Sequence, residues 1–134
     1  MLDGSVTLSW YFEDEQTKAS LAVLDRVVSE GAIVPPLWHF EVANGLQISV
    51  RRRRVDAGFR DRSLKHLASL DIATDSDSEA YAWSASVRLA ERHLLTVYDA
   101  SYLELAQRRR LPLATLDGAL RKAANGEAID VIGA

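Results

Sequence analysis

The sequence contains no cysteine among its 134 residues. This absence excludes disulfide scaffolds, thiolate-ligated zinc or iron–sulfur sites, and cysteine nucleophiles. Lysine is also scarce, because 13 of the 16 basic residues are arginine. The longest hydrophobic run, residues 32–38, has only about seven residues, counting two prolines, whereas a membrane-spanning helix needs roughly 20. The first basic residue is Lys18, so we expect no secretory signal. The resulting expectation is a cytoplasmic protein with no membrane partner.

What is present is an ordinary globular composition, with 48% hydrophobic and 26% charged residues and no repeat or linker. We therefore expect one domain covering residues 1–134. The net charge is −3, from 19 acidic and 16 basic residues. Proteins that bind nucleic acid through their overall field are usually basic. Any nucleic-acid contact here must come from a local patch or from a cation held by acids. The arginine bias fits phosphate recognition, but it fits a GC-rich genome equally well.

Short apolar segments alternate with amphipathic segments along the chain. This alternation predicts an α/β sandwich, with a short central parallel sheet flanked by helices on both faces. We expect the end of a short strand at residues 1–3, strands at 32–34, 113–115 and 129–132, a strand or turn at 95–97, and no clear assignment for 70–74. We expect helices at residues 6–12, about 15–31, 37–53, 56–69, 78–93, 99–109 and 117–125. Gly31 ends the second of these helices, and Asp56 and Ser78 are the expected caps of the fourth and fifth. In the second helix, Leu21, Leu24 and Val28 are expected on the inner face.

Three aspartates follow apolar segments of the expected sheet: Asp3, Asp99 and Asp117. In parallel sheets, ligands bind beyond the carboxyl ends of the strands. Each aspartate also has a simpler interpretation. Asp99 and Asp117 start expected helices, where aspartate is a favoured cap, and Asp3 suits a turn. If the sheet is parallel, however, all three side chains project from one edge.

Glu41 lies within an apolar helical segment, residues 37–43, and Asn44 shares its helix face. A carboxylate in such a segment is costly to bury without a partner, unless it lies on a solvated edge. Two carboxylates about 4 Å apart repel by about 4 kcal/mol at an effective dielectric constant near 20. Several such pairs would rival a domain's entire stability of roughly 5–15 kcal/mol. The cluster must therefore take up protons or hold a hard cation such as Mg²⁺ or Mn²⁺. Because Mg²⁺ can activate water for attack on phosphorus, the predicted chemistry is phosphodiester hydrolysis.

At these residues the chain resembles the PIN-domain ribonucleases, and most closely the VapC toxins of bacterial type II toxin–antitoxin pairs. The resemblance covers residues 2–6, 34–46, 94–106 and 111–117 in order. The most specific features are the helix start Tyr98-Asp99-Ala100 and the strand end Ala114-Thr115-x-Asp117. A lone aspartate, or a lone Glu-x-x-Asn, would be a weak signal.

The resemblance implies a PIN-domain sandwich that cleaves RNA with metal-activated water and leaves 5′-phosphate and 3′-hydroxyl ends. It also implies a homodimer and a cognate antitoxin whose C-terminal segment covers the acidic pocket. It places four residues at the catalytic Mg²⁺ site, with the first and third as the firmest direct ligands: Asp3, Glu41, Asp99 and Asp117. It places three residues where polar groups orient carboxylates and water: Ser5, Asn44 and Thr115.

Two departures from the family pattern concern the first segment. Only two residues precede Asp3, where several apolar residues are usual, and Gly4 stands where alanine or threonine is common. This puts the rigidity of Asp3 in question, and Gly4 loosens the turn slightly.

The run Arg51, Arg52, Arg53 and Arg54 has two interpretations. It is a candidate for steering RNA phosphates. It also suits a solvated helix C-terminus, which favours cations.

Two other functions compete with the nuclease hypothesis. A phospho-acceptor signalling domain would need an acidic pair after its first strand and a lysine after its last strand. Asp3 is followed by Gly4, and every lysine falls in an expected helix. The remaining alternative is a PIN-fold module that binds RNA or protein but is catalytically weak or inactive.

Overall fold

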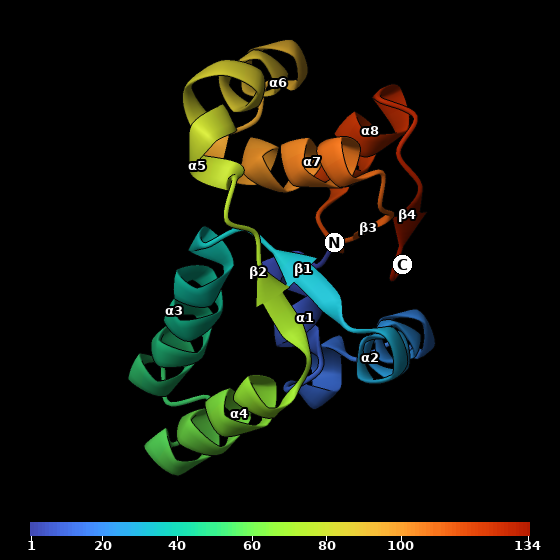
Figure 1. Cartoon of the computed structure of the whole chain (residues 1–134). Coiled ribbons are helices and arrows are strands. Elements are labelled where there is room, and N and C mark those ends of the chain that lie inside the picture. The colour runs from blue at the N-terminus through green and yellow to red at the C-terminus, as the bar shows by residue number, and fades with distance from the viewer.

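A computed structural model describes all residues, 1–134 (Figure 1). A 3₁₀ turn, Glu13–Glu15, precedes the helix Lys18–Glu30, and a π-helical segment, Ala82–Ser86, joins the helices Ser78–Tyr81 and Val87–His93. The strands are β1 (Ala32–Val34), β2 (Ile72–Thr74), β3 (Leu113–Ala114) and β4 (Val131–Ile132). The helices are α1 (Gly4–Ser9), α2 (Lys18–Glu30), α3 (Leu37–Arg51), α4 (Ala57–Ser69), α5 (Ser78–Tyr81), α6 (Val87–His93), α7 (Val97–Arg109) and α8 (Gly118–Gly126).

The β structure is short and entirely parallel. β1 pairs with β2, and β3 pairs with β4. Leu2 lies between the two pairs: its N–H donates to the Ile33 carbonyl at 3.4 Å, and it forms a parallel bridge with Ala114. Helices surround these strands on both sides in Figure 1. The predicted α/β fold with a short parallel sheet is therefore confirmed, and residues 70–74, which had no clear assignment, contain β2.

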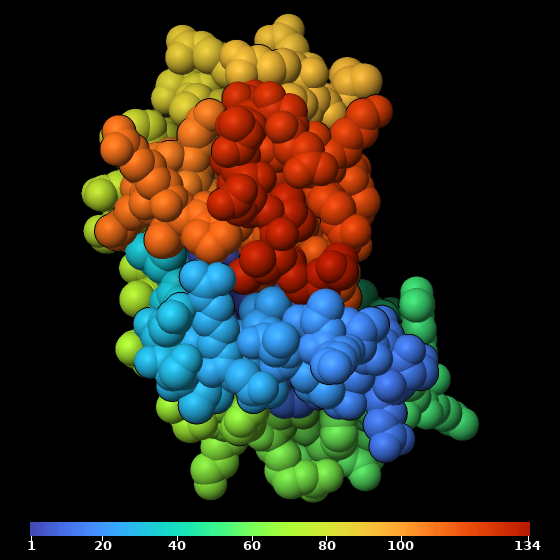
Figure 2. Space-filling model, turned by 90° about the vertical axis from the view of Figure 1, so that its right-hand side faces the viewer, coloured from blue at the N-terminus to red at the C-terminus, as the bar shows by residue number.

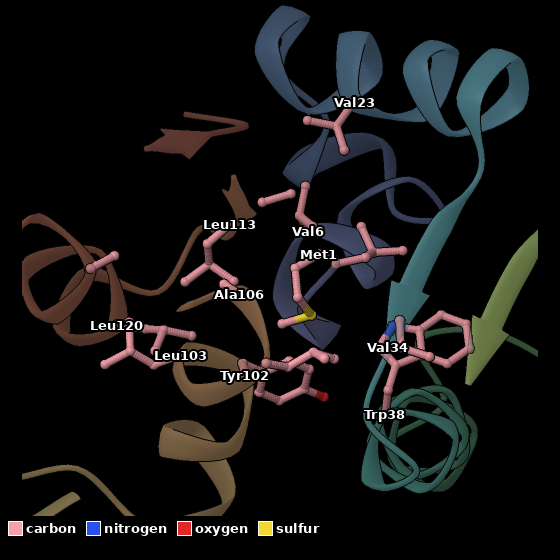
Figure 3. Close-up of a cluster of buried hydrophobic side chains, with 14 of the residues drawn as sticks. Met1, Val6, Val23, Val34, Trp38, Tyr102, Leu103, Ala106, Leu113 and Leu120 are labelled. Atoms are coloured by element: carbon pink, nitrogen blue, oxygen red, sulfur yellow. The ribbon is translucent and has the colours of Figure 1, made fainter. Parts of the chain in front are cut away.

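The hydrophobic core joins segments from the whole length of the chain (Figure 3). Val34 and Trp38 approach it from one side, and Tyr102, Leu103 and Leu113 from the other. Burying one such aliphatic side chain contributes about 1.5–3 kcal/mol. No helix is both long and apolar enough to cross a membrane.

A close approach between α1 and α3 positions the N-terminal part of the site. A Cβ atom at Gly45 would lie 2.5 Å from Leu8 Cδ1, so a larger residue at this point in α3 would require the Leu8 side chain to move. Nearby, Trp38 Nε1 donates to the buried Thr7 hydroxyl at 3.1 Å. These two contacts pack α3 against α1, which brings Glu41 of α3 toward Asp3, the residue that caps α1.

The beginning and inner face of α2 differ from expectation. The helix starts after Thr17, whose side chain and that of Ser20 form a reciprocal capping box. Its buried apolar residues are Val23 and Val27, whereas the expected inner-face residue Val28 is 65% exposed. Leu21 is also exposed and Leu24 is half-buried. The predicted inner face was wrong by about one residue, because several neighbouring positions of α2 carry aliphatic side chains and periodicity alone chose the wrong set.

Between residues 75 and 97 one expectation was wrong, and the choice between a strand and a turn at 95–97 is decided against the strand. Ser78 is the first residue of α5 rather than its cap, and its hydroxyl donates to Asp75 at 2.6 Å. Residues 95–97 form no strand. Instead, Leu94 adopts a left-handed conformation at φ 55° that ends α6, and Thr96 caps α7. Asp99 therefore lies in the first turn of α7 and does not follow a strand.

The remaining boundaries shift by a few residues. The first helix covers Gly4–Ser9 rather than 6–12, and α3 ends at Arg51 rather than at residue 53. The start of α4 after the Asp56 cap and its end at Ser69 are confirmed.

Candidate active site

Asp3 is fixed at the point where the bridging residue Leu2 passes into α1. Its backbone N–H donates to the Ala114 carbonyl at 3.1 Å, and its side chain caps α1 by accepting from the Ser5 N–H. The Thr115 hydroxyl donates to its second carboxylate oxygen. Asp3 is only 5% exposed. Both carboxylate oxygens are therefore held in place by neighbouring donors.

Ser5 and Thr115 also connect Asp3 to the loop that carries Asp117. The Leu116 N–H donates to the Ser5 hydroxyl at 3.0 Å, and the Asp117 N–H donates to the Thr115 hydroxyl at 3.0 Å. Asp117 itself caps α8 by accepting from the Leu120 N–H at 2.9 Å. The capping interpretation is thus correct for Asp117. It does not compete with a site role, because a capping carboxylate retains free lone pairs.

Glu41 reaches the same region from the first turns of α3. Its carboxylate accepts a hydrogen bond from the buried Tyr102 hydroxyl at 3.2 Å. A Cβ atom at Gly4 would lie 3.2 Å from Glu41 Oε2. Gly4 therefore leaves room for the Glu41 carboxylate beside the start of α1, a consequence that the sequence alone did not suggest.

Asp99 approaches from the first turn of α7. Its backbone N–H donates to the Thr96 hydroxyl at 3.1 Å, so Thr96, and not Asp99, is the helix cap. Tyr102 lies three residues later and hence on the same face of α7. α7 therefore directs Asp99 and the tyrosine that holds Glu41 toward one place.

The four carboxylates are close enough to repel one another. Burial and, to a smaller extent, the charge on Asp117 raise the pKa of Asp3. The hydrogen bonds from Thr115 and Ser5 lower this pKa but do not cancel the increase. Burial raises the pKa of Glu41, and the charges on Asp3 and Asp99 add to the increase. Burial and the charge on Asp117 raise the pKa of Asp99. None of the four forms an ion pair with a basic residue. The structure thus gathers all four predicted acids around one electronegative region.

The donor set suits a hard divalent cation. It consists of carboxylate and hydroxyl oxygens, which Mg²⁺ and Mn²⁺ prefer, and no positive side chain competes for them. In this conformation, however, no three acidic or histidine side chains lie close enough together to enclose an ion. Coordination by three of the carboxylates therefore requires their side chains to rotate toward the shared centre.

Comparison with known proteins bears on this arrangement. The PIN domain family model matches residues 1–126. The chain belongs to the PIN domain family. It is also similar to the crystal structure of PAE2754 from Pyrobaculum aerophilum, with 26% sequence identity and a TM-score of 0.67 over 91% of this chain and 82% of that chain. No curated protein matches the sequence. The PIN domain is in general a nuclease fold, and it suggests nucleic acid as the class of ligand.

Not every predicted site residue of this PIN domain reaches the acidic region. Asn44 is exposed on α3, and its side chain forms no hydrogen bond. Arg51 lies ten residues after Glu41, about 15 Å further along the helix axis. Arg54 pairs with Asp14 and Glu15. The arginine run therefore occupies the opposite end of α3 from the acids.

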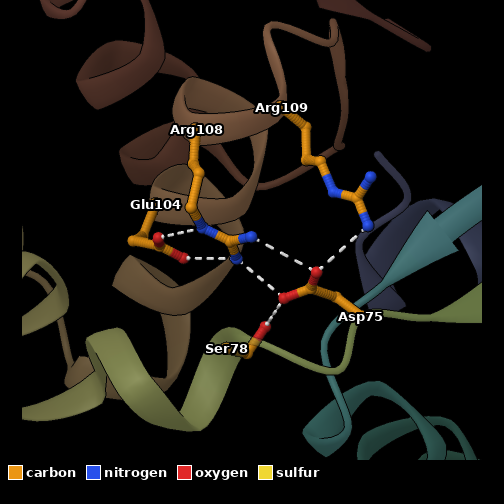
Figure 4. A network of polar contacts seen from close by, with 5 residues as sticks. All are labelled: Asp75, Ser78, Glu104, Arg108 and Arg109. Atoms are coloured by element: carbon orange, nitrogen blue, oxygen red, sulfur yellow. Dashed lines mark hydrogen bonds and ion pairs between the residues drawn. The ribbon is translucent and has the colours of Figure 1, made fainter.

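A second group of acids in the PIN domain is fully compensated (Figure 4). Arg108 donates to Asp75 at 2.7 Å and to Glu104 at 2.6 Å, and Arg109 donates to Asp75 at 3.4 Å. Burial would raise the pKa of Asp75, but the hydrogen bonds from Arg108 and Ser78 outweigh it and lower the pKa to about 2. This network joins the β2–α5 loop to α7, and we assign it a structural role.

Three aromatic residues near the acids were missed by sequence reasoning. Tyr102 holds Glu41, and its spacing from Asp99 was the available signal. Phe40 and Tyr98 directly precede Glu41 and Asp99 in the sequence, and they are 78% and 68% exposed. Their exposure could not be read from the sequence, because an aromatic residue on a helix can face either the core or the surface.

Proposed function

We propose that this PIN domain is a Mg²⁺-dependent endoribonuclease that acts as the toxin of a toxin–antitoxin pair. The observation that carries the proposal is the convergence of four carboxylates that pair with no basic side chain, three of which, Asp3, Glu41 and Asp99, have pKa values raised by burial and by the neighbouring acids. Such a cluster is unfavourable when ionised unless it binds protons or a metal. The nuclease fold and the resemblance to VapC toxins favour the metal.

Each residue has a distinct part in this proposal. Asp3 and Asp99 would bind the metal directly, and Glu41 and Asp117 would bind it through water or hold a second ion. Bound Mg²⁺, for which Mn²⁺ is a possible substitute, would polarise the phosphodiester and lower the pKa of a bound water. The Thr115 hydroxyl and the Ser5 N–H hold the Asp3 carboxylate in place, as the Tyr102 hydroxyl holds Glu41. Asn44 would act on water near Glu41 only after a change in its side-chain position.

The exposed rings of Phe40 and Tyr98 support RNA as the substrate. Single-stranded nucleic acid binds by stacking its bases on aromatic side chains, at about 1–3 kcal/mol per base. The net charge of −3 makes long-range attraction of RNA weak. Local stacking and phosphate–metal contacts would therefore supply most of the affinity, with Arg51, Arg52 and Arg53 as more distant phosphate contacts.

The test is RNA cleavage by the Asp99→Asn variant in millimolar Mg²⁺. We expect at least a 1,000-fold loss of cleavage with an unchanged fold, because the substitution removes a charged ligand but almost no volume. Asp130→Asn is the matched control, since Asp130 is exposed and its side chain forms no hydrogen bond. Full activity in Asp99→Asn would refute the site assignment.

The toxin role, the antitoxin and the homodimer require separate tests. We expect the chain to arrest growth when expressed alone and Asp99→Asn not to do so. Co-expression of a small protein encoded next to it, with a DNA-binding head and a flexible C-terminal tail, should restore growth and block cleavage. Light scattering should give the mass of a dimer. Growth that is unaffected by an actively cleaving chain would contradict the toxin role while leaving the nuclease intact.

A PIN-fold module that binds RNA or protein with little or no catalysis is the alternative. It predicts RNA binding that is equal in the native protein and in Asp99→Asn, with no cleavage by either in Mg²⁺ or Mn²⁺.

A further inference from the structure

One face of α3 is exposed from the first turn of the helix to the last. Phe40, Asn44, Gln47 and Arg51 are exposed and follow one another at spacings of four, three and four residues. Side chains at such spacings lie on the same face of a helix. In Figure 1, α3 lies at the outer edge of the molecule, with α1 and the strands on its inner side. We call these four residues the α3 track, and none of them is acidic.

The track begins beside the candidate active site. Phe40 directly precedes Glu41, and its side chain is 78% exposed. Glu41 lies about 100° further round the helix, where its carboxylate accepts from the Tyr102 hydroxyl. An exposed ring of this kind offers a surface on which an unpaired base can stack. The phosphate of a nucleotide stacked on Phe40 would therefore lie next to the acids.

The middle of the track carries two side-chain amides. The Gln47 amide oxygen accepts from Arg60 Nη1 of α4 at 2.7 Å, which leaves the amide nitrogen of Gln47 free to donate. Asn44 is exposed and its amide is free as well. The charge of Arg60 is balanced, because this residue also pairs with Asp61 at 2.9 Å. The middle of the track therefore presents neutral donors, which commonly contact phosphate and sugar oxygens.

The track ends at arginines that have no acidic partner. Arg51, Arg52 and Arg53 are exposed and form no ion pair, whereas Arg54 pairs with the 3₁₀ turn before α2. Figure 2 shows the green side chains of this part of the chain projecting from the edge of the molecule. Unpaired guanidinium groups suit phosphate oxygens, because their planar donors match the phosphate geometry. In a protein of net charge −3, this end of α3 is a local anion-binding surface.

The length of the track sets the length of strand that it can hold. Phe40 and Arg51 are eleven residues apart, which is about 16 Å along the helix axis. A stacked strand advances about 3.4 Å per nucleotide, so about five nucleotides cover this distance. The bases of a duplex are already stacked and paired, so a duplex cannot use the Phe40 ring in this way.

We propose that the α3 track holds about five nucleotides of single-stranded RNA on one side of the scissile phosphate. One base stacks on Phe40, the amides of Asn44 and Gln47 contact the backbone, and Arg51 with its neighbouring arginines binds a phosphate at the far end. The inference rests on the proposed nuclease function for its position relative to the acids. Its test measures binding without cleavage, so the two can fail separately.

The test measures the affinity of a fluorescein-labelled oligouridine of about 12 nucleotides by anisotropy, in EDTA, so that metal-dependent cleavage does not occur. We expect Arg51→Gln to weaken binding about fivefold at low salt. It should also make the dependence of log Kd on log salt shallower by about 0.7, the value for one phosphate contact with a single strand. Arg88→Gln is the matched control, because Arg88 is an exposed arginine of α6 that forms no ion pair.

Variants at the other end of the track separate stacking from charge. Phe40→Ala should weaken binding about tenfold with an unchanged salt dependence, because a stacked ring contributes no counterion release. Phe40→Trp should keep the native affinity, since it retains an aromatic face. A duplex RNA of the same length should bind at least tenfold more weakly than the single strand. These results in a chain that cleaves no RNA would support the track and refute the nuclease.

Three results would overturn the proposal. Equal affinity and salt dependence in Arg51→Gln and Arg88→Gln would mean that the strand does not reach the end of α3. Equal binding of single-stranded and duplex RNA would mean that the surface attracts phosphate without holding unpaired bases. Unchanged RNA binding by Arg51→Gln, with weaker inhibition by the small protein encoded next to this chain, would assign the face to a protein partner.

Discussion

The molecule contains two groups of acids, each built around one buried aspartate, and the pKa values of these two aspartates shift in opposite directions. Asp3 is 5% exposed and Asp75 is 1% exposed, so burial alone would raise the pKa of both. Asp75 faces two arginines, and its pKa is lowered to about 2. Asp3 faces hydroxyl and amide donors and another carboxylate, and its pKa is raised.

We infer from this difference that the Asp75 group has a structural role, and it supports the functional role that we propose for the other group. The Asp75 network stabilises the fold because its charges are balanced. The group of Asp3, Glu41, Asp99 and Asp117 is unbalanced, so it stores an electrostatic cost that a proton or a cation relieves. Asp3 and Asp75 are the same residue type and are both buried, so the difference between them lies in their partners. A strongly perturbed acid indicates a functional site only when the perturbation lacks a compensating cation.

The largest expected effect on stability comes from removing the charge of Asp75, which is balanced by Arg108 and Arg109. In Asp75→Asn, Arg108 keeps only Glu104 as a charged partner, because the buried carboxylate of Asp75 is lost. We expect this substitution to lower the free energy of unfolding by about 3 kcal/mol. Urea denaturation measures this change. Asp14→Asn is the control, because Asp14 pairs with Arg54 at an exposed surface and should cost less than about 0.5 kcal/mol. Similar losses in the two variants would contradict the distinction.

The second prediction is that a divalent cation stabilises the protein by neutralising the carboxylates of Asp3, Glu41, Asp99 and Asp117. A divalent cation that binds only the folded state adds about 2.7 kcal/mol at 100 times its Kd. We therefore expect Mg²⁺ or Mn²⁺ to raise Tm in thermal denaturation. The increase should be much smaller in Asp99→Asn and unchanged in Asp130→Asn. An increase that persists in Asp99→Asn would place the cation elsewhere.

The third prediction concerns how Glu41 is held. Tyr102→Phe removes the hydroxyl that donates to Glu41 but keeps the buried ring. Loss of such an orienting group typically reduces activity or metal affinity about 10- to 100-fold, and we expect the lower end of this range here. The measurement is metal dependence of RNA cleavage. Tyr98→Phe is the matched control, since the Tyr98 hydroxyl is exposed and forms no hydrogen bond.

The smallest effect concerns pH and has opposite signs in the two groups. Because the folded-state pKa of Asp99 is raised, Asp99→Asn should be more stable than the native protein, by about 1 kcal/mol, only as pH rises above about 4. Because the folded-state pKa of Asp75 is lowered, its stabilising contribution is present above about pH 4 and disappears as pH falls toward 2. Metal-free urea denaturation from pH 2.5 to 7 checks both signs. Parallel pH profiles for Asp99→Asn and Asp75→Asn would refute the comparison.

Much of the fold was predictable because its signals are local. β1 between Gly31 and Pro35, the cap at Asp56 and the helix after Asp117 each follow from neighbouring residues. Residues 95–97, expected as a strand or a turn, form no strand because Leu94 adopts a left-handed conformation and Thr96 caps α7. Periodicity does not reveal such a backbone conformation at a leucine. The helix from 78 to 93 was predicted in extent, but its π-helical segment was not.

The sequence by itself singled out Asp3, Glu41, Asp99 and Asp117 as candidates, since they stand out by type and by their apolar neighbours. Only the tertiary structure decided which charges remain unbalanced. It places Arg108 and Arg109 beside Asp75, over 30 residues away in the chain, and places Tyr102, Ser5 and Thr115 around the four acids. The physical reason is that a carboxylate's pKa depends on partners within a few ångströms, and those partners are brought together by packing between distant segments.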